Sequence, residues 1–289
     1  MINIFNQLKY PYPTKFITII GFQIAFIDEG NSENVLLFIH GLGSYLKAWQ
    51  RNIPELTKHF RCIALDLPGY GKSSKAIHSG EVNFYVKVLK EFVDKLGLKN
   101  LTLVGHSMGG QISLSFAIKY PYQLNKLILA APAGFETFTD EEIELFRKIV
   151  NPDIIFRTSN EQIRFNYKIN FYNMPPEAEE MISDRILIKE DPEFYNHCTV
   201  VSNSLFGLLK APVFNQLDKL NISTLILFGL EDLLIPNKSV HDATTKEIAT
   251  LGASKIKNSN LILLDKCGHF IQFEKPDEFN NALISFINN

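Results

Sequence analysis

The sequence predicts an α/β fold in which a mostly parallel, doubly wound sheet of eight strands is covered by helices on both faces. Val35–Ile39 is continuously apolar, as expected for a strand that is buried on both sides, and Leu101–Val104 is a mainly apolar, strand-like run. Stretches with helical periodicity, such as Val82–Leu96, lie between runs of this kind. The two patterns alternate along the 289 residues, which favours parallel pairing of the strands.

The first half of the chain supplies most of the predicted strands. Phe16–Ile20 and Phe22–Asp28 are short β-rich runs, and we expect them to form an antiparallel hairpin at one edge of the sheet. Arg61–Leu65 and Lys126–Ala130 are further buried strands, and a helix is expected around Tyr45–His59.

The pattern changes in the second half of the chain. From Phe135 to Pro212 the sequence contains helical runs but no convincing buried strand. Strands resume at Thr224–Phe228 and Leu261–Leu264, each followed by a predicted helix. We therefore divide the chain into a core, residues 1–134 and 213–289, and a helical cap inserted at residues 135–212.

Composition limits the possible partners and the location. The net charge is −2 with no run of basic residues, so neither nucleic acid nor an anionic membrane surface is an expected partner. Cys62, Cys198 and Cys267 are widely spaced and predict neither a zinc site nor a disulfide framework, which favours the cytoplasm. We expect no signal peptide, no membrane span, no metal and no cofactor. The oligomeric state is not indicated.

The strongest motif is the segment Leu101–Gly110, which predicts a strand, a sharp turn and a helix with Ser107 at the apex. Gly105 and Gly109 complete the pattern G-x-S-x-G around this serine. A serine that projects from such a turn needs small neighbours two residues away on each side, because strand and helix pass closely there. The following helix directs its N–H groups toward the reacting centre. Ser107 is therefore the candidate nucleophile.

A serine nucleophile needs a base and an acid, and in a parallel sheet both are expected at the carboxyl ends of strands. Of the histidines that follow strands, His269 is preceded by a glycine and is the candidate base. His106 also follows a strand, but we expect it to point away from the serine beside it. Asp232 follows another strand and is the candidate acid, with Glu231 as its competitor. The chain order serine, acid, histidine is typical of this architecture.

The tetrahedral intermediate of acyl transfer also needs N–H donors for its oxyanion. We expect one from the backbone of Met108, directly after the nucleophile. A second is expected from Leu42, in the loop after the strand Val35–Ile39. Gly41 and Gly43 flank Leu42 and let this backbone approach a substrate.

Five motifs in this order, HGLG, DLPGYGKS, GHSMGG, GLEDLLIP and CGHF, resemble the α/β-hydrolase superfamily across nearly the whole chain. The resemblance implies a Ser-His-Asp hydrolase, most often a carboxylesterase or lipase-like enzyme, with a helical lid over its pocket. It agrees with the roles assigned to Ser107, Asp232 and His269. It also implies that His40 and Asp66 hold loops beside the site and take no part in the chemistry.

We therefore predict a serine hydrolase that cleaves a small or medium apolar carboxylic ester through an acyl-enzyme. Relatives with Asp at the elbow, the dehalogenases and epoxide hydrolases, are disfavoured by Ser107. Carbon–carbon bond hydrolases often have Asn before the serine and Trp after the histidine, where this chain has His106 and Phe270. That alternative stays open, as do a lyase, an acyltransferase, a cofactor-free haloperoxidase or perhydrolase, and a ligand-binding receptor with slow turnover.

Overall fold

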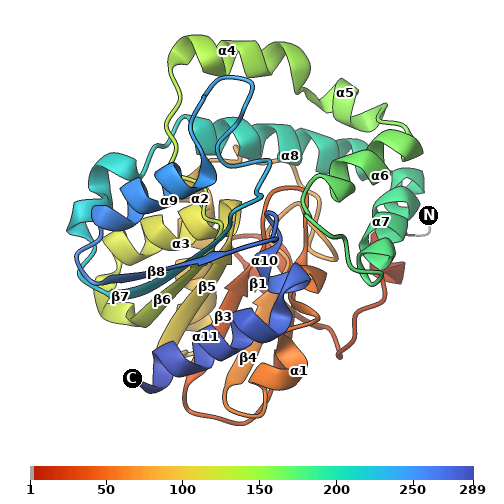
Figure 1. The fold of residues 1–289 in the computed structure, drawn as a ribbon. Helices are drawn as coiled ribbons and strands as arrows, with labels where there is room; N and C mark the ends of the chain where they lie inside the picture. Colours follow the sequence, from red (N-terminus) through yellow and green to blue (C-terminus); the bar gives the residue numbers. More distant parts are fainter. Residues whose placement is uncertain (1–2) are drawn as a thin grey trace.

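The computed structural model describes residues 3–289 and contains one eight-stranded sheet with helices on both faces (Figure 1). The strand order is β1-β2-β4-β3-β5-β6-β7-β8. The strands are β1 (Lys15–Ile19), β2 (Phe22–Glu29), β3 (Val35–Ile39), β4 (Arg61–Leu65), β5 (Leu101–His106), β6 (Leu124–Ala130), β7 (Ser223–Gly229) and β8 (Ser259–Leu264). Strand β2 pairs antiparallel with β1 and β4, and all other pairings are parallel. The predicted fold class and the predicted hairpin are confirmed.

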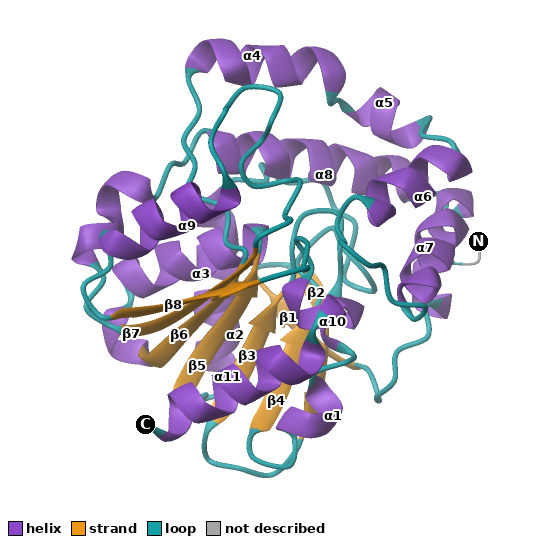
Figure 2. Cartoon of the chain, in the orientation of Figure 1, coloured by secondary structure: helices purple, strands orange, loops and turns teal. Residues whose placement is uncertain are grey.

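Helices α1 and α11 cover one face of the sheet, and α2 and α3 cover the other (Figure 2). The helices of the predicted core are α1 (Ile53–Leu56), α2 (Val82–Lys95), α3 (Met108–Lys119), α9 (Thr245–Ser254), α10 (Ile271–Glu274) and α11 (Pro276–Asn288). The continuous apolar run of β3 is buried at every position, as expected for a central strand covered on both faces.

The helix expected around Tyr45–His59 is interrupted. The structure has a 3₁₀ turn at Leu46–Trp49 and then the single-turn helix α1. Pro54 lies in the first turn of α1, where its missing N–H costs nothing. A continuous helix through this position would lose a backbone hydrogen bond and clash with the preceding turn, which explains the break.

Between β6 and β7 the structure has helices and, within residues 131–222, no strand. These helices are α4 (Asp140–Ile149), α5 (Pro152–Phe156), α6 (Asn160–Lys168), α7 (Ala178–Leu187) and α8 (Phe194–Leu209). Figure 1 shows α8 between the sheet and the outer helices α4 and α5. The side chains of Thr139, Asn151 and Ser159 accept backbone hydrogen bonds at the starts of α4, α5 and α6. The boundaries of the cap at 135 and 212 stay a prediction.

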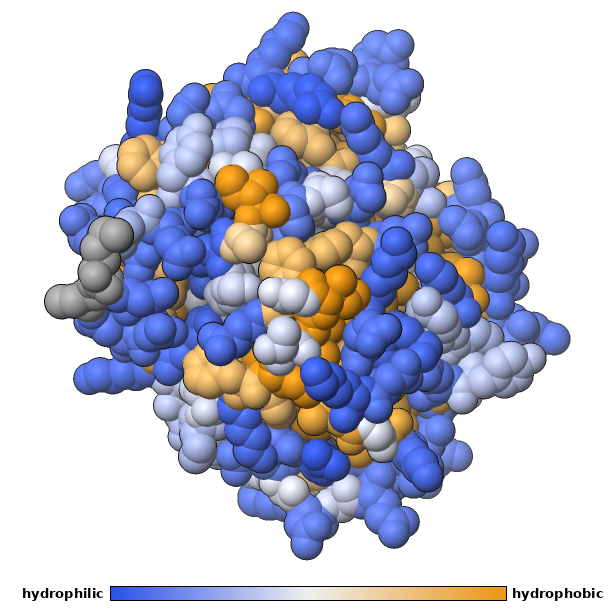
Figure 3. Space-filling model, turned by 180° about the vertical axis from the view of Figure 1, so that it is seen from behind, coloured by the Kyte–Doolittle hydropathy of each residue, from blue (hydrophilic) through white to orange (hydrophobic). Residues whose placement is uncertain are grey.

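Cys62, Cys198 and Cys267 are free and buried, and burial raises the thiol pKa of Cys62 to about 12 and that of Cys198 to about 11. Across residues 3–289, no helix has the length and apolar character needed to cross a bilayer. Seen from behind, the surface is mostly hydrophilic, with apolar residues gathered near the middle of that face (Figure 3).

Candidate active site

Ser107 lies at the turn between β5 and α3 with a strained backbone. Its φ is 52° and its ψ is −116°, a conformation that residues with a side chain rarely adopt. The turn is fixed on both sides, because Ser107 N–H donates to the carbonyl of Ala130 (3.0 Å) and its own carbonyl accepts from Ala133 N–H (3.0 Å). These contacts to the end of β6 hold the serine at the carboxyl edge of the sheet.

The two glycines of the elbow are required by close backbone contacts. A Cβ atom added to Gly105 would lie 2.4 Å from the carbonyl oxygen of Gly109. A Cβ atom on Gly109 would lie 2.2 Å from the carbonyl oxygen of Ile39 in β3. Both distances are far inside van der Waals contact, so neither position accepts a side chain without movement of strand or helix.

Asp232 and His269 come together from the loops after β7 and β8. His269 Nδ1 lies 2.7 Å from Asp232 Oδ2, and both side chains are buried. Asp232 Oδ1 accepts the N–H groups of Leu234 (2.8 Å) and Ile235 (3.0 Å), which fixes the carboxylate. Because the carboxylate accepts a hydrogen bond from Nδ1, Nε2 of His269 is left as the basic nitrogen. His269 and Ser107 line the same cavity.

The competing acid, Glu231, has a different position. Its Oε2 accepts the backbone N–H of Cys267 (2.9 Å), and its own N–H donates to the Cys267 carbonyl (3.0 Å). Glu231 therefore joins the loops after β7 and β8 to each other. Of the two adjacent carboxylates, the structure brings only Asp232 to the imidazole of His269.

The two predicted oxyanion donors belong to segments next to the nucleophile. Met108 is the first residue of α3, where backbone N–H groups have no partner within the helix. Leu42 and Gly41 line the cavity, and a Cβ atom on Gly41 would lie 3.2 Å from Cβ of Ser107. For residues 3–289, neither Leu42 N–H nor Met108 N–H has a protein acceptor. Their role as oxyanion donors stays a prediction.

His40 supports the loop that carries Leu42. Its Nδ1 donates to the carbonyl of Gly41 (2.8 Å), and its Nε2 accepts the N–H of Leu67 (3.0 Å). Burial lowers the pKa of His40 to about 4, so the ring is neutral at physiological pH. The side chain thus joins the loops after β3 and β4 as a neutral donor and acceptor.

Asp66 organises the next loop in the same way. Its carboxylate accepts the N–H groups of Leu46 (2.8 Å) and Lys72 (2.7 Å) and the hydroxyl of Tyr10 (2.5 Å). Burial raises the pKa of Asp66 to about 6. These three donors account for the buried carboxylate at position 66. It lies close to the site but does not line the cavity.

His106 has a place that the sequence did not predict. Its Nε2 donates to the carbonyl of His269 (3.1 Å), and the two rings lie 4.9 Å apart. Burial, followed by the proximity of His269, holds the pKa of His106 well below its usual value, so this ring stays neutral. His106 also lines the cavity that contains Ser107. It therefore positions the backbone of the candidate base.

The cavity lined by Ser107 and His269 has a volume of about 430 Å³ and is mainly apolar. Its apolar lining from the predicted cap consists of Phe138, Phe146, Ile149, Val150, Leu205, Leu208, Leu209 and Pro212. Gln111 joins α3 to the end of α8, because its Nε2 donates to the carbonyls of Leu208 (3.1 Å) and Ala211 (2.8 Å). Glu136, Asn170, Asn237 and Ser239 add polar groups to the wall.

A much smaller cavity of about 20 Å³ lies next along the loop after β3, and its lining includes Gly43, Ser44, the half-buried Arg185 and Asp184, whose carboxylate is paired with Lys47 (2.9 Å). The guanidinium of Arg185 donates to Nε2 of His197 and lies 5.2 Å from the ring of Phe194. In the part of the chain that the structure describes, Arg185 has no carboxylate within ion-pair distance. Sequence reasoning did not identify this cation.

The chain is similar to several known proteins. A family profile described as "alpha/beta hydrolase fold" matches residues 34–181. A 2-hydroxy-6-oxononadienedioate/2-hydroxy-6-oxononatrienedioate hydrolase of Pseudomonas putida is 29% identical over 95% of this chain and 96% of its own length. A 2-hydroxy-6-oxo-6-phenylhexa-2,4-dienoate hydrolase of Comamonas testosteroni is 31% identical over 92% of this chain and 91% of its own length. The solved structure of a probable hydrolytic enzyme of Pseudomonas aeruginosa PAO1 has a similar fold, with a TM-score of 0.85 and 24% identity. The match covers 98% of this chain and 96% of that one.

Proposed function

The chain belongs to the α/β-hydrolase family, and we propose that it is a serine hydrolase that cleaves the carbon–carbon bond beside a ketone in an oxo-dienoate. The Asp232–His269 contact beside Ser107 supports the serine mechanism. The choice of bond is supported by one observation, the similarity over more than nine tenths of the chain to hydrolases named for such substrates.

In this proposal Ser107 attacks the ketone carbon and gives its proton to Nε2 of His269. The negative charge that forms on the carbonyl oxygen is stabilised by the N–H groups of Leu42 and Met108. Asp232 keeps His269 in the required tautomer and stabilises its protonated form. Water then attacks the acyl-enzyme with His269 as base, and a carboxylic acid is released.

A carbon leaving group departs only if its electron pair can be delocalised. In a 2-hydroxy-6-oxo-dienoate, transfer of a proton from the 2-hydroxyl to the carbon beside the ketone gives a 2-oxo form. When the bond to the acyl carbon breaks, its electrons pass through the conjugated chain to this 2-oxygen, which takes up a proton. The net reaction adds one water and gives one carboxylic acid and one hydroxydienoate.

Such a substrate carries a carboxylate, which requires a cation or several donors nearby. Gly43 and Ser44 border the small cavity of Arg185, and the acidic residue there, Asp184, is already paired with Lys47. No Lys or Arg lines the main cavity within residues 3–289. We propose that the guanidinium of Arg185 gives up its contact with His197 and binds the substrate carboxylate instead. The remainder of the substrate, including its acyl end, would then lie in the main cavity.

The ester substrate favoured by the sequence becomes the second candidate. It is supported by the apolar lining of the main cavity and by His106 and Phe270 at positions where carbon–carbon bond hydrolases often have Asn and Trp. An ester needs no carbon leaving group, and the same serine chemistry serves it. The cytoplasmic location proposed from the sequence is supported by the three free, buried cysteines.

The test uses purified protein and its Ser107→Ala variant. Both are assayed with 2-hydroxy-6-oxo-6-phenylhexa-2,4-dienoate and with p-nitrophenyl esters from C2 to C12. The proposal expects Ser107-dependent loss of the dienoate absorbance with a kcat/KM above that of every ester. Turnover of esters alone would select the ester candidate. Labelling by a fluorophosphonate without any turnover would refute both substrate classes, and absence of labelling would refute the nucleophile.

A further inference from the structure

We propose that Glu136 determines which substrates enter the main cavity, by excluding an acyl portion that carries a carboxylate and favouring one that is neutral or carries a cationic donor. The inference uses the proposed function only in taking this cavity as the substrate site. Glu136 lines the cavity together with Phe138, Asn237 and Ser239. Of the lining residues that the structure describes, it is the only Asp, Glu, Lys or Arg.

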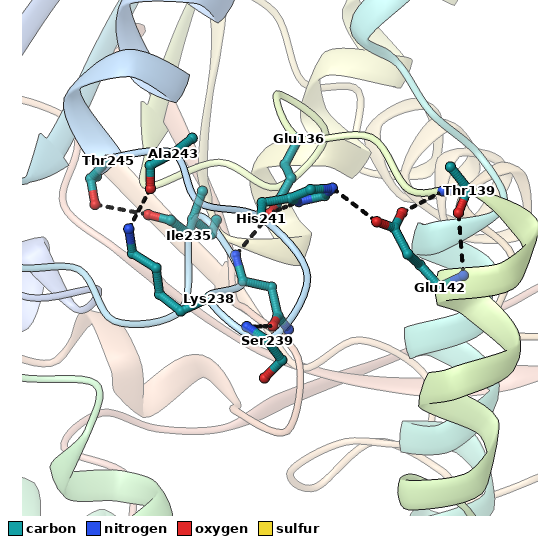
Figure 4. Close-up of polar contacts among 10 residues, drawn as sticks. Glu136, Thr139, Glu142, Ile235, Lys238, Ser239, His241, Ala243 and Thr245 are labelled. Carbon is teal, nitrogen blue, oxygen red and sulfur yellow. Dashed lines mark hydrogen bonds and ion pairs between the residues drawn. The ribbon is translucent and has the colours of Figure 1, made fainter.

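The carboxylate of Glu136 is held by one of its oxygens. Oε1 accepts the backbone N–H of Asn237 at 2.8 Å and lies 2.5 Å from Nδ1 of His241. Figure 4 shows the imidazole of His241 between Glu136 and Glu142, whose Oε1 lies 3.4 Å from Nε2 of the ring. An oxygen that receives two donors is best matched by an ionised carboxylate.

The second oxygen of Glu136 is free. Oε2 receives no hydrogen bond from residues 3–289, and this oxygen is partly accessible to solvent. Because the side chain is only 7% exposed and borders the cavity, we infer that Oε2 is the acceptor that Glu136 presents to a ligand. Within an apolar wall, such an oxygen repels an anion and binds a guanidinium or ammonium group strongly.

Burial makes this effect strong enough to select substrates. Desolvation raises the pKa of Glu136, and the donors from His241 and Asn237 oppose that rise. Two charges in a partly desolvated cavity interact several-fold more strongly than in bulk water. A ligand carboxylate near Glu136 should therefore bind at least about tenfold more weakly than its neutral analogue.

The experiment compares three esters that differ in the charge at the end of the acyl chain. They are p-nitrophenyl heptanoate (neutral), mono-p-nitrophenyl adipate (anionic) and p-nitrophenyl 6-guanidinohexanoate (cationic), assayed at pH 8. Glu136→Gln removes the charge and keeps an oxygen for Asn237 N–H. Glu142→Gln is the matched control, because it removes a carboxylate from the same cluster that does not line the cavity.

The proposal expects Glu136→Gln to raise the anionic-to-neutral ratio of kcat/KM about tenfold or more and to lower the cationic-to-neutral ratio. Glu142→Gln should leave both ratios within about twofold of the wild type. Unchanged ratios in Glu136→Gln, or equal changes in both variants, would overturn it. A melting temperature near that of the wild type shows that each variant is folded.

A binding measurement separates this proposal from the proposed function. The three esters are titrated into Ser107→Ala protein, with and without Glu136→Gln, by calorimetry. If the wild type turns over no carbonyl substrate, the serine hydrolase proposal fails, and the ratio of dissociation constants still decides the role of Glu136. Equal affinity for the anionic and neutral esters, or binding of none of the three, would reject that role.

Discussion

Replacing Asp232 by Asn tests the catalytic assignment most directly. Asp232 Oδ2 lies 2.7 Å from His269 Nδ1 and both side chains are buried, so the interaction is little screened by solvent. At an effective dielectric of about 20, two unit charges at this distance attract by roughly 6 kcal/mol when the imidazole is protonated. Since about 1.4 kcal/mol corresponds to a tenfold change in rate, the upper limit of the loss is about 10⁴-fold.

The amide of the Asp232→Asn variant also inverts the hydrogen bond. It would keep an oxygen for the N–H groups of Leu234 and Ile235 and would direct its NH₂ group at Nδ1 of the imidazole. The ring would then carry its proton on Nε2 and could not accept one from Ser107. We expect kcat to fall about 10³–10⁴-fold with little change in melting temperature. Glu231→Gln is the control and should stay within about threefold. The assignment would be refuted if Asp232→Asn lost less than tenfold in kcat, or if Glu231→Gln lost more than Asp232→Asn.

Three further predictions concern stability and substrate binding. The pKa of His40 is lowered from 6.5 to about 4, so between these pH values the unfolded chain binds a proton that the folded chain does not. The free energy of unfolding should therefore fall by roughly 3 kcal/mol as the pH drops from about 6.5 to about 4. Urea titrations at several pH values should show that this free energy depends less steeply on pH in His40→Asn, and an equal dependence would contradict the lowered pKa. Gly109→Ala would place a Cβ 2.2 Å from a carbonyl oxygen of β3, so it should lower the free energy of unfolding by about 3 kcal/mol and abolish activity. Gly97→Ala has no atom near its Cβ and a φ of +59°, so in thermal denaturation it should lower this free energy by only about 1 kcal/mol and keep activity. Arg185→Gln should lower kcat/KM for the oxo-dienoate about 10- to 100-fold and change that for p-nitrophenyl esters less than about threefold; equal losses would show that Arg185 has only a structural role.

The framework of the site could be predicted because each member follows a strand that is recognisable from local sequence. Ser107, Asp232 and His269 all stand at carboxyl ends of parallel strands, and such ends meet at one edge of the sheet. The elbow could also be predicted in detail, since only glycine tolerates the contacts seen at Gly105 and Gly109. The preference for Asp232 over the adjacent carboxylate had less support from the sequence, because the two residues differ by only one position in their distance from the strand.

The groups that face the substrate could not be predicted, because long-range packing decides where they point. Glu136 receives its backbone hydrogen bond from a residue 101 positions later in the chain, and no local pattern announces that contact. Gln111 contacts carbonyls that follow it by 97 and 100 positions. The expectation that His106 points away from the nucleophile used local geometry alone and therefore missed its hydrogen bond to the carbonyl of His269.

These long-range contacts give the site an electrostatic direction. Arg185 borders the small cavity together with Asp184, whose carboxylate is paired with Lys47, and Glu136 borders the main cavity that Ser107 lines. A substrate with one carboxylate has a favourable orientation only with that carboxylate toward Arg185, and this places its uncharged acyl end beside Glu136. In a substrate with a second carboxylate at the acyl end, either orientation places one of the two carboxylates beside Glu136. Under the proposed function and the role inferred for Glu136, the two charges together would select monoanionic substrates over dianionic ones and would fix which carbonyl carbon is presented to the nucleophile.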